Sequence, residues 1–164
     1  MKKIAVLMGS DSDLPVVKAA FALFREYGVP YEAHVMSAHR SPEAVREFSA
    51  AARERGFGAI IAAAGKAAHL AGAVAANTLP VIGIPVKSST LDGLDALLAT
   101  VQMPSGMPVA TVAIDGAANA ALLAVQMLSM EDAALASKLD AKRAAMRAQI
   151  AEKDARLQKE LETL

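Results

Sequence analysis

The sequence predicts an α/β fold, in which a doubly wound parallel sheet carries helices on both faces. Short apolar runs, typical of strands buried on both faces, alternate with segments whose apolar residues recur at helical spacing. Strands that alternate with helices of roughly 10–15 residues form βαβ units and therefore a parallel sheet. The length of 164 residues fits one such domain.

The N-terminal part supplies the first three elements. Lys3–Met8 is an apolar run that ends at Gly9, which predicts a buried strand. A helix is predicted over Leu14–Tyr27, where apolar residues keep helical spacing until Gly28 ends the pattern. Tyr31–Met36 is predicted to form the second strand.

The remaining elements follow the same alternation. Ser41 and Pro42 open a second helix, because serine is favoured at the N-cap and proline at the first helical position. The later elements are predicted, in chain order, as strand Phe57–Ala64, helix His69–Asn77, strand Val81–Val86, helix Gly93–Gln102, strand Val109–Ile114 and helix Ala117–Met130.

The last segment, residues 131–164, predicts a long amphipathic helix. Charged residues separate apolar residues that recur at steps of four, seven and three: Leu135, Leu139, Met146, Ile150, Leu157, Leu161 and Leu164. This helix is longer than a small domain needs, so we expect it to pack on a neighbouring subunit; an ordinary surface helix is the alternative. We therefore expect one domain over residues 1–164, with a core over 1–130 and a helical extension over 131–164.

Composition narrows the class of protein. Basic and acidic residues balance at 17 each and aromatics are 4%, which argues against nucleic-acid binding. The absence of cysteine excludes disulfides, thiolate metal sites and a cysteine nucleophile. No apolar run resembles a signal sequence or approaches the roughly 20 residues that span a bilayer, so we expect a soluble, cytoplasmic protein. The alanine-rich 54% hydrophobic content favours extensive packing, including packing between subunits of a homo-oligomer.

The polar residues gather where ligands bind in an open parallel sheet, beyond the carboxyl ends of the strands. The loop after the first strand begins with Gly9, which permits a tight turn, and continues with Ser10, Ser12 and Asp13. Free N–H groups and the helix dipole favour an anion there. A simple helix cap by Ser12 or Asp13 explains the same residues.

The loop after the second strand combines Ser37, His39 and Arg40. The planar guanidinium of arginine suits a phosphate, and a serine hydroxyl can add a hydrogen bond. Histidine, whose ordinary pKa is about 6.5, can both give and take a proton near neutral pH. His39 is therefore the candidate acid–base; a histidine that only caps a helix is the alternative.

The loop after the third strand places His69 among small residues, which would let a planar ligand approach the backbone N–H groups. Close packing of helix on strand, with a structural histidine, is the alternative explanation. His34 lies within a strand and receives no role. Dispersed histidines without cysteine predict no metal site.

Six motifs in this chain resemble those of the N5-carboxyaminoimidazole ribonucleotide mutases, also called the catalytic subunit of phosphoribosylaminoimidazole carboxylase. The resemblance runs from Ile4 to Leu128. The motifs are Met-Gly-Ser-Asp-Ser-Asp at 8–13, Ser-Ala-His-Arg-Ser-Pro at 37–42, Ala-Ala-His-Leu at 67–70, Pro-Val-Ile-Gly-Ile-Pro-Val at 80–86, Val-Gln-Met-Pro-Ser-Gly-Met-Pro-Val at 101–109 and Asn-Ala-Ala-Leu-Leu at 119–123.

The resemblance implies a three-layer α/β sandwich of flavodoxin-like or Rossmann-like type, a homo-octamer with sites between subunits, and no cofactor. It implies an isomerase of purine biosynthesis that moves a carboxyl group on an aminoimidazole ribonucleotide, with CO2 as the intermediate. His39 would be the general acid–base, with His69 and the backbone around Gly65 near the carboxyl group. Four residues would hold the ribose phosphate: Ser10, Asp13, Ser37 and Arg40.

The third loop departs from the mutase pattern, which usually has glycine at Lys66 and proline at Ala71. The related carboxylases use CO2 and the uncarboxylated nucleotide; they tend to have a basic residue at the position of Lys66 and usually lack the histidine equivalent to His69. His69 therefore favours the mutase, while Lys66, as a substrate-binding residue, keeps a direct carboxylase open. A flavodoxin-like flavin-binding module is the alternative from another class, although the chain offers no Trp and only two Tyr to sandwich a flavin.

Overall fold

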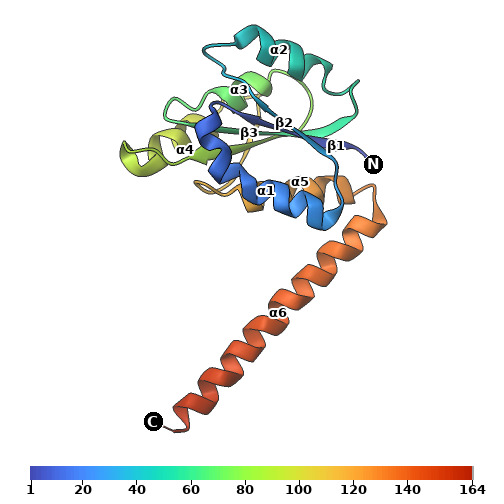
Figure 1. Ribbon diagram of the computed structural model, residues 1–164, viewed down its shortest axis with the longest axis vertical. Helices are drawn as coiled ribbons and strands as arrows, with labels where there is room; N and C mark the ends of the chain where they lie inside the picture. The colour runs from blue at the N-terminus through green and yellow to red at the C-terminus, as the bar shows by residue number, and fades with distance from the viewer. Residues whose placement is uncertain (164) are drawn as a thin grey trace.

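The computed structural model describes residues 1–163 and contains a five-stranded sheet in which every strand pairing is parallel (Figure 1). The strands lie in the order β2-β1-β3-β4-β5, which is the order of flavodoxin-like folds. Their bounds are β1 (Lys3–Met8), β2 (Tyr31–Val35), β3 (Phe57–Gly65), β4 (Val81–Val86) and β5 (Ala110–Thr111). The predicted doubly wound α/β fold is confirmed.

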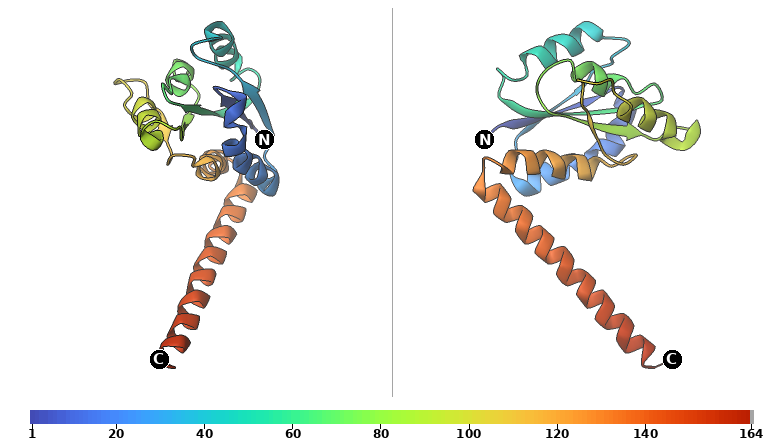
Figure 2. Two further views of the ribbon diagram at one scale, coloured as in Figure 1. Left: turned by 60° about the vertical axis from the view of Figure 1, so that its left-hand side comes forward. Right: turned by 180° about the vertical axis from the view of Figure 1, so that it is seen from behind.

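Helices cover both faces of this sheet, as the three views in Figures 1 and 2 show. One face carries α1 (Leu14–Tyr27) and α5 (Ala117–Ser129), and the other carries α2 (Pro42–Ala51), α3 (Leu70–Val74) and α4 (Leu94–Val101). The division follows from the alternation of side chains along a strand. In β1, for example, Val6 packs under α1 and α5, whereas Leu7 packs under α2 and α3.

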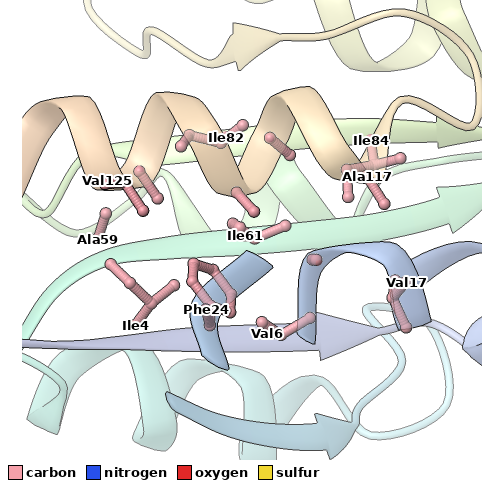
Figure 3. Packing of buried hydrophobic residues seen from close by; sticks show 14 of the residues in the cluster. Ile4, Val6, Val17, Phe24, Ala59, Ile61, Ile82, Ile84, Ala117 and Val125 are labelled. Atoms are coloured by element: carbon pink, nitrogen blue, oxygen red, sulfur yellow. The ribbon is translucent and has the colours of Figure 1, made fainter. Parts of the chain in front are cut away.

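The larger core cluster lies between the sheet and α1 and α5 (Figure 3). Phe24 of α1 and Val125 of α5 pack there with Ile4, Val6 and Ile61, and all five side chains are fully buried. Each such side chain stabilises the fold by about 1.5–3 kcal/mol. The inner face of α5 is made of alanines, which let this helix approach the sheet closely and account for part of the alanine surplus: Ala117, Ala120, Ala121 and Ala124.

The fifth strand is shorter than the predicted Val109–Ile114. The chain still runs beside β4, because the N–H of Val112 donates to Gly83 O (3.1 Å) and the N–H of Asp115 donates to Pro85 O (2.9 Å). Pro85 has no N–H to return to this edge, so the ladder beside it is incomplete. The prediction of the strand was correct and its length was wrong.

Two helices differ in detail from the sequence analysis. Ser41 occupies the N-cap position of α2 but makes no capping hydrogen bond. Its hydroxyl instead accepts the N–H of Ser37 (3.0 Å) and donates to Ser37 O (3.2 Å), which closes the loop before the helix. The predicted helix His69–Asn77 is only the five-residue α3, and the side chain of Asn77 donates to Ser49 Oγ (2.7 Å) beyond its end.

The last helix, α6 (Ala133–Leu161), leaves the body of the protein and projects away from it (Figures 1 and 2). Asp132 caps its first turn by accepting the N–H groups of Ala134 and Leu135, and Leu135 is buried in the core. From residue 141 to residue 163 every side chain is exposed. Leu164 of the predicted pattern lies outside the described residues. Within residues 1–163, no helix has the length and apolar character required to cross a membrane.

Candidate active site

A cavity of about 590 Å³ opens at the carboxyl ends of the strands. That volume is within the roughly 300–1,000 Å³ of ordinary small-molecule sites. Loops that follow β1, β2, β3 and β4 form its walls, as expected for an open parallel sheet. All eight residues that the sequence singled out line this one cavity: Ser10, Asp13, Ser37, His39, Arg40, Gly65, Lys66 and His69.

The first wall is the loop after β1, which is stabilised by hydrogen bonds within itself. Ser10 Oγ accepts the N–H of Ser12 (3.2 Å), and Asp13 Oδ2 accepts the N–H of Ser10 (3.1 Å), which together form a capping box. Asp13 is only 7% exposed. Burial raises the pKa of its carboxyl group; the charge of Asp11 acts in the same direction, and the hydrogen bond from Ser10 opposes both.

The second wall is held in shape by Ser37. Its hydroxyl accepts the backbone N–H groups of His39 (3.3 Å) and Arg40 (3.1 Å), so the backbones of both residues are held in place. The Arg40 side chain turns back toward the first wall and donates to Gly9 O (3.4 Å). The guanidinium group and the Ser10 turn therefore lie together at one end of the cavity.

The third wall is a tight turn at the end of β3. Lys66 has a φ of 53°, in the left-handed region that favours glycine. Gly65 lies so close to β4 that an added Cβ would meet Val86 O at 3.1 Å. The N–H groups of Ala68 and His69 are used within the turn, donating to Lys66 O (2.8 Å) and Ala67 O (2.9 Å).

The two histidines of the cavity contact each other directly. Nε2 of His39 lies 2.7 Å from Nδ1 of His69, and the rings meet edge to face with centroids 4.8 Å apart. A hydrogen bond between two ring nitrogens needs a proton on one and a lone pair on the other. The pair can therefore hold a proton between the second and third walls. Sequence reasoning placed both residues on one rim but did not predict this contact.

The sequence analysis assigned no role to Lys87 and Ser88, which line the cavity from the end of β4. Their position directly after a predicted strand was the available signal. His34, which received no role, lies 3.5 Å from Glu32 and packs edge to face on Phe48, away from the cavity. Among residues 1–163, no three His, Cys, Asp or Glu side chains are grouped as a metal site would require.

Comparison with known proteins identifies the family of this chain. The family model described as AIR carboxylase matches residues 3–149. The chain belongs to the AIR carboxylase family. That result confirms the resemblance drawn from the six motifs.

Members of the AIR carboxylase family with two different names are similar to this chain. It is 53% identical to the N5-carboxyaminoimidazole ribonucleotide mutase of Pyrococcus horikoshii over 156 residues, 94% of this chain and 88% of that protein. It is 54% identical to the phosphoribosylaminoimidazole carboxylase of Saccharomyces cerevisiae over 138 residues, 84% of this chain but 24% of the longer yeast protein.

A solved structure of the same fold supports the assignment to the AIR carboxylase family. The crystal structure of Treponema denticola PurE superimposes with a TM-score of 0.84 and covers 94% of this chain and 97% of its own. The two sequences are 27% identical. The layered architecture described above is thus shared with that protein.

Proposed function

We propose that this chain is an N5-carboxyaminoimidazole ribonucleotide mutase, an isomerase of de novo purine biosynthesis. The observation that carries the proposal is the His39–His69 contact of 2.7 Å inside a cavity lined by the cations of Arg40, Lys66 and Lys87. A proton carrier amid positive charge suits an anionic substrate that must gain and lose one proton. Near-complete coverage of a relative that carries the mutase name adds support.

The phosphate end of the substrate binds where the first and second walls meet. Arg40 supplies a guanidinium group, and Ser10 and Ser37 supply hydroxyls. Asp13, the buried carboxylate beside them, does not attract phosphate; it accepts hydrogen bonds from the ribose hydroxyls. These contacts are remote from the reacting atoms, and their binding energy fixes the imidazole ring against the histidine pair.

The reaction needs one proton carrier used twice. His39 protonates the exocyclic nitrogen, the C–N bond of the carbamate breaks, and its electron pair remains on nitrogen as CO2 departs. The electron-rich C4 then attacks the carbon of CO2 to form a C–C bond. Loss of the C4 proton to His39 restores the aromatic ring and regenerates the catalyst. Atoms and charge balance without an added oxidant or reductant.

The third wall retains CO2 between the two steps. Ala67 and Leu70 contribute apolar surface to the cavity, while His69 and the backbone around Gly65 and Lys66 lie close to the departing carboxyl group. Recapture of CO2 is then nearly intramolecular, which gives a large advantage over a bimolecular encounter. His69 holds the proton-bearing face of His39 in place.

The direct carboxylase is the second candidate function, and Lys66 is the observation that favours it. This lysine lines the cavity in a backbone conformation that favours glycine, so the side chain is retained at a cost in conformational energy. Its ammonium group would hold a free carboxylate or polarised CO2. The direct carboxylase would start from aminoimidazole ribonucleotide and CO2.

Two assays of the purified protein distinguish these functions. The first offers N5-carboxyaminoimidazole ribonucleotide at low bicarbonate, and the second offers aminoimidazole ribonucleotide with bicarbonate, both without ATP. We expect rapid turnover of the first substrate. Turnover of only the second substrate would favour the carboxylase over the mutase. No turnover in either assay would refute both activities.

Two variants test the residue roles. His39→Asn keeps a polar side chain of similar size but cannot carry the proton, so we expect kcat to fall by about 10²–10⁴ while substrate binding is retained. Arg40→Ala should instead weaken nucleotide binding. Near-normal turnover of His39→Asn, or an unchanged dissociation constant for Arg40→Ala, would contradict the corresponding assignment.

We further propose that the protein assembles into a homo-oligomer, an octamer in the form implied by the resemblance. Two apolar stripes support this. One is the outer face of α4, and the other is the distal part of α6, with exposed residues Leu94, Leu98, Val101, Met146, Ile150, Leu157 and Leu161. Exposed apolar stripes of this kind mark contact surfaces. Light scattering during gel filtration should give eight chains per particle; a monomer would refute the proposal.

A further inference from the structure

Lys87 is a cavity residue to which the proposed mechanism assigns no role. It follows the last residue of β4, and its backbone is fixed because its N–H donates to Asp115 Oδ1 (2.9 Å). Asp115 adopts a φ of 57°, in the left-handed region. The ammonium group of Lys87 lies 3.2 Å from a carboxylate oxygen of Asp92, and both side chains are largely exposed, at 57% and 83%.

The cations of the cavity lie over different strands of the sheet. The guanidinium group of Arg40 reaches the loop after β1, where it donates to Gly9 O (3.4 Å), while Lys66 and Lys87 follow β3 and β4. Gly65 pairs with Val86, so Lys66 and Lys87 are the next residues on neighbouring strands. With strands about 4.8 Å apart, β1 and β4 are separated by roughly 10 Å.

The histidine pair joins the two loops that carry Arg40 and Lys66. His39 comes from the loop after β2 and His69 from the loop after β3, and their ring nitrogens meet at 2.7 Å. A substrate that carries phosphate at one end and a carboxyl group at the other matches this order of charges. With the phosphate beside Arg40, the carboxyl group extends toward Lys66 and Lys87.

We propose that Lys87 is a specificity-determining residue that binds the carboxylate of the carboxylated nucleotide. The proposal rests on the proposed function, because it needs a substrate with a phosphate and a carboxyl group. Asp92 is the competing anion: it pairs with Lys87 in the free protein and gives up the ammonium group when the substrate carboxylate arrives. The fixed backbone of Lys87 keeps its side chain at the cavity wall throughout this exchange.

The test compares two ligands that differ only in the carboxyl group. Dissociation constants of the full-length protein are measured by calorimetry for 4-carboxyaminoimidazole ribonucleotide and for aminoimidazole ribonucleotide. Because a hydrogen bond to a charged group is strong, Lys87→Gln should weaken the first ligand about tenfold. The second ligand should change by less than about twofold, since its phosphate contacts are untouched.

Three further variants serve as controls. Lys87→Arg keeps the positive charge and should retain most of the preference for the carboxylated ligand. Asp92→Asn removes the competing anion, and asparagine tolerates the φ of 52° at this position, so the carboxylated ligand should bind about twofold more tightly. Lys18→Gln makes the same change in net charge on the exposed side of α1, outside the cavity, and should alter neither constant.

The outcomes separate this proposal from the proposed function. Equal weakening of both ligands by Lys87→Gln, or no weakening of either, would overturn the role of Lys87 while leaving the mutase intact. Wild-type protein that binds both ligands but turns neither over would overturn the reaction, and the ratio of constants would still decide the role of Lys87. Failure of the wild type to bind either ligand would overturn both.

Discussion

Replacing Lys66 with glycine should change the stability of this protein and its substrate binding in opposite directions. Lys66 has a φ of 53°, and a left-handed conformation costs a residue with a Cβ about 1–2 kcal/mol. Glycine removes that cost but adds about 0.5–1 kcal/mol of conformational entropy to the unfolded chain. The difference predicts that Lys66→Gly gains about 0–1.5 kcal/mol. For a chain of this length, that corresponds to a rise of about 0–6 °C in the midpoint of thermal unfolding.

The same substitution should weaken binding of the carboxylated nucleotide, because it removes an ammonium group from the cavity. We expect the mutase reaction itself to be kept, because the mutase pattern that the third loop resembles has glycine at the position of Lys66. The assays are thermal unfolding at one fixed protein concentration and the two substrate assays described above. Lys66→Asn is the matched control, because asparagine is neutral yet tolerates positive φ.

Two results would refute this reasoning. A fall in the unfolding midpoint of several degrees in both variants would mean that the Lys66 side chain makes stabilising contacts that outweigh its backbone strain. Loss of mutase turnover in Lys66→Gly, with the direct carboxylation of aminoimidazole ribonucleotide also lost, would make Lys66 essential to the chemistry. The mutase pattern of the third loop would then be a poor guide to this chain.

Three further predictions concern stability. Burial raises the pKa of Asp13, so the free protein should lose stability as pH rises from the ordinary aspartate value of 3.8 through the raised value; Asp13→Asn should remove this loss, as urea midpoints across pH 4–8 would reveal. Hydrogen bonding to Lys3 lowers the pKa of Glu32. The contribution of the Glu32 carboxylate to stability is therefore fully present above pH 4.5 and is lost as pH falls through the lowered value, so Glu32→Gln should flatten the acid side of the plot of urea midpoint against pH. Gly83→Ala would place a Cβ 2.3 Å from Thr100 Cγ2, and the resulting overpacking should cost about 1–3 kcal/mol, with an unchanged urea midpoint counting against the packing argument.

The order and bounds of several elements could be predicted because local pattern and tertiary packing agree there. Lys3–Met8, Leu14–Tyr27 and Val81–Val86 were predicted with the bounds that the structure has. The fifth strand was predicted too long because its length depends on the partner strand. Pro85 of β4 cannot donate to it, and that relation is absent from the pattern of residues 109–114 themselves.

The loops that form the candidate site could be predicted from the sequence, but the contacts between their side chains could not. Sequence position gave the eight residues, because the carboxyl ends of parallel strands share one edge. The contact between His39 and His69 joins residues 30 positions apart and depends on the orientation of two exposed rings. Lys87 was assigned no role because a lysine after a strand is usually a solvated charge. Its place in the cavity depends on Asp115, whose side chain fixes the backbone of Lys87 from the loop before α5.

The serines of the cavity position the loops as well as offering contacts to a ligand. A hydroxyl has two lone pairs and one proton, and Ser37 uses both lone pairs on the N–H groups of His39 and Arg40. Among residues 1–163 its proton goes to no acceptor, so it is available for the proposed hydrogen bond to a phosphate oxygen. One side chain thereby fixes the backbones of His39, the proposed proton carrier, and Arg40, the proposed phosphate ligand. In the proposed mechanism, the backbone of this single loop then sets the distance between the bound phosphate and His39. Such fixed positions favour recapture of CO2 before it escapes.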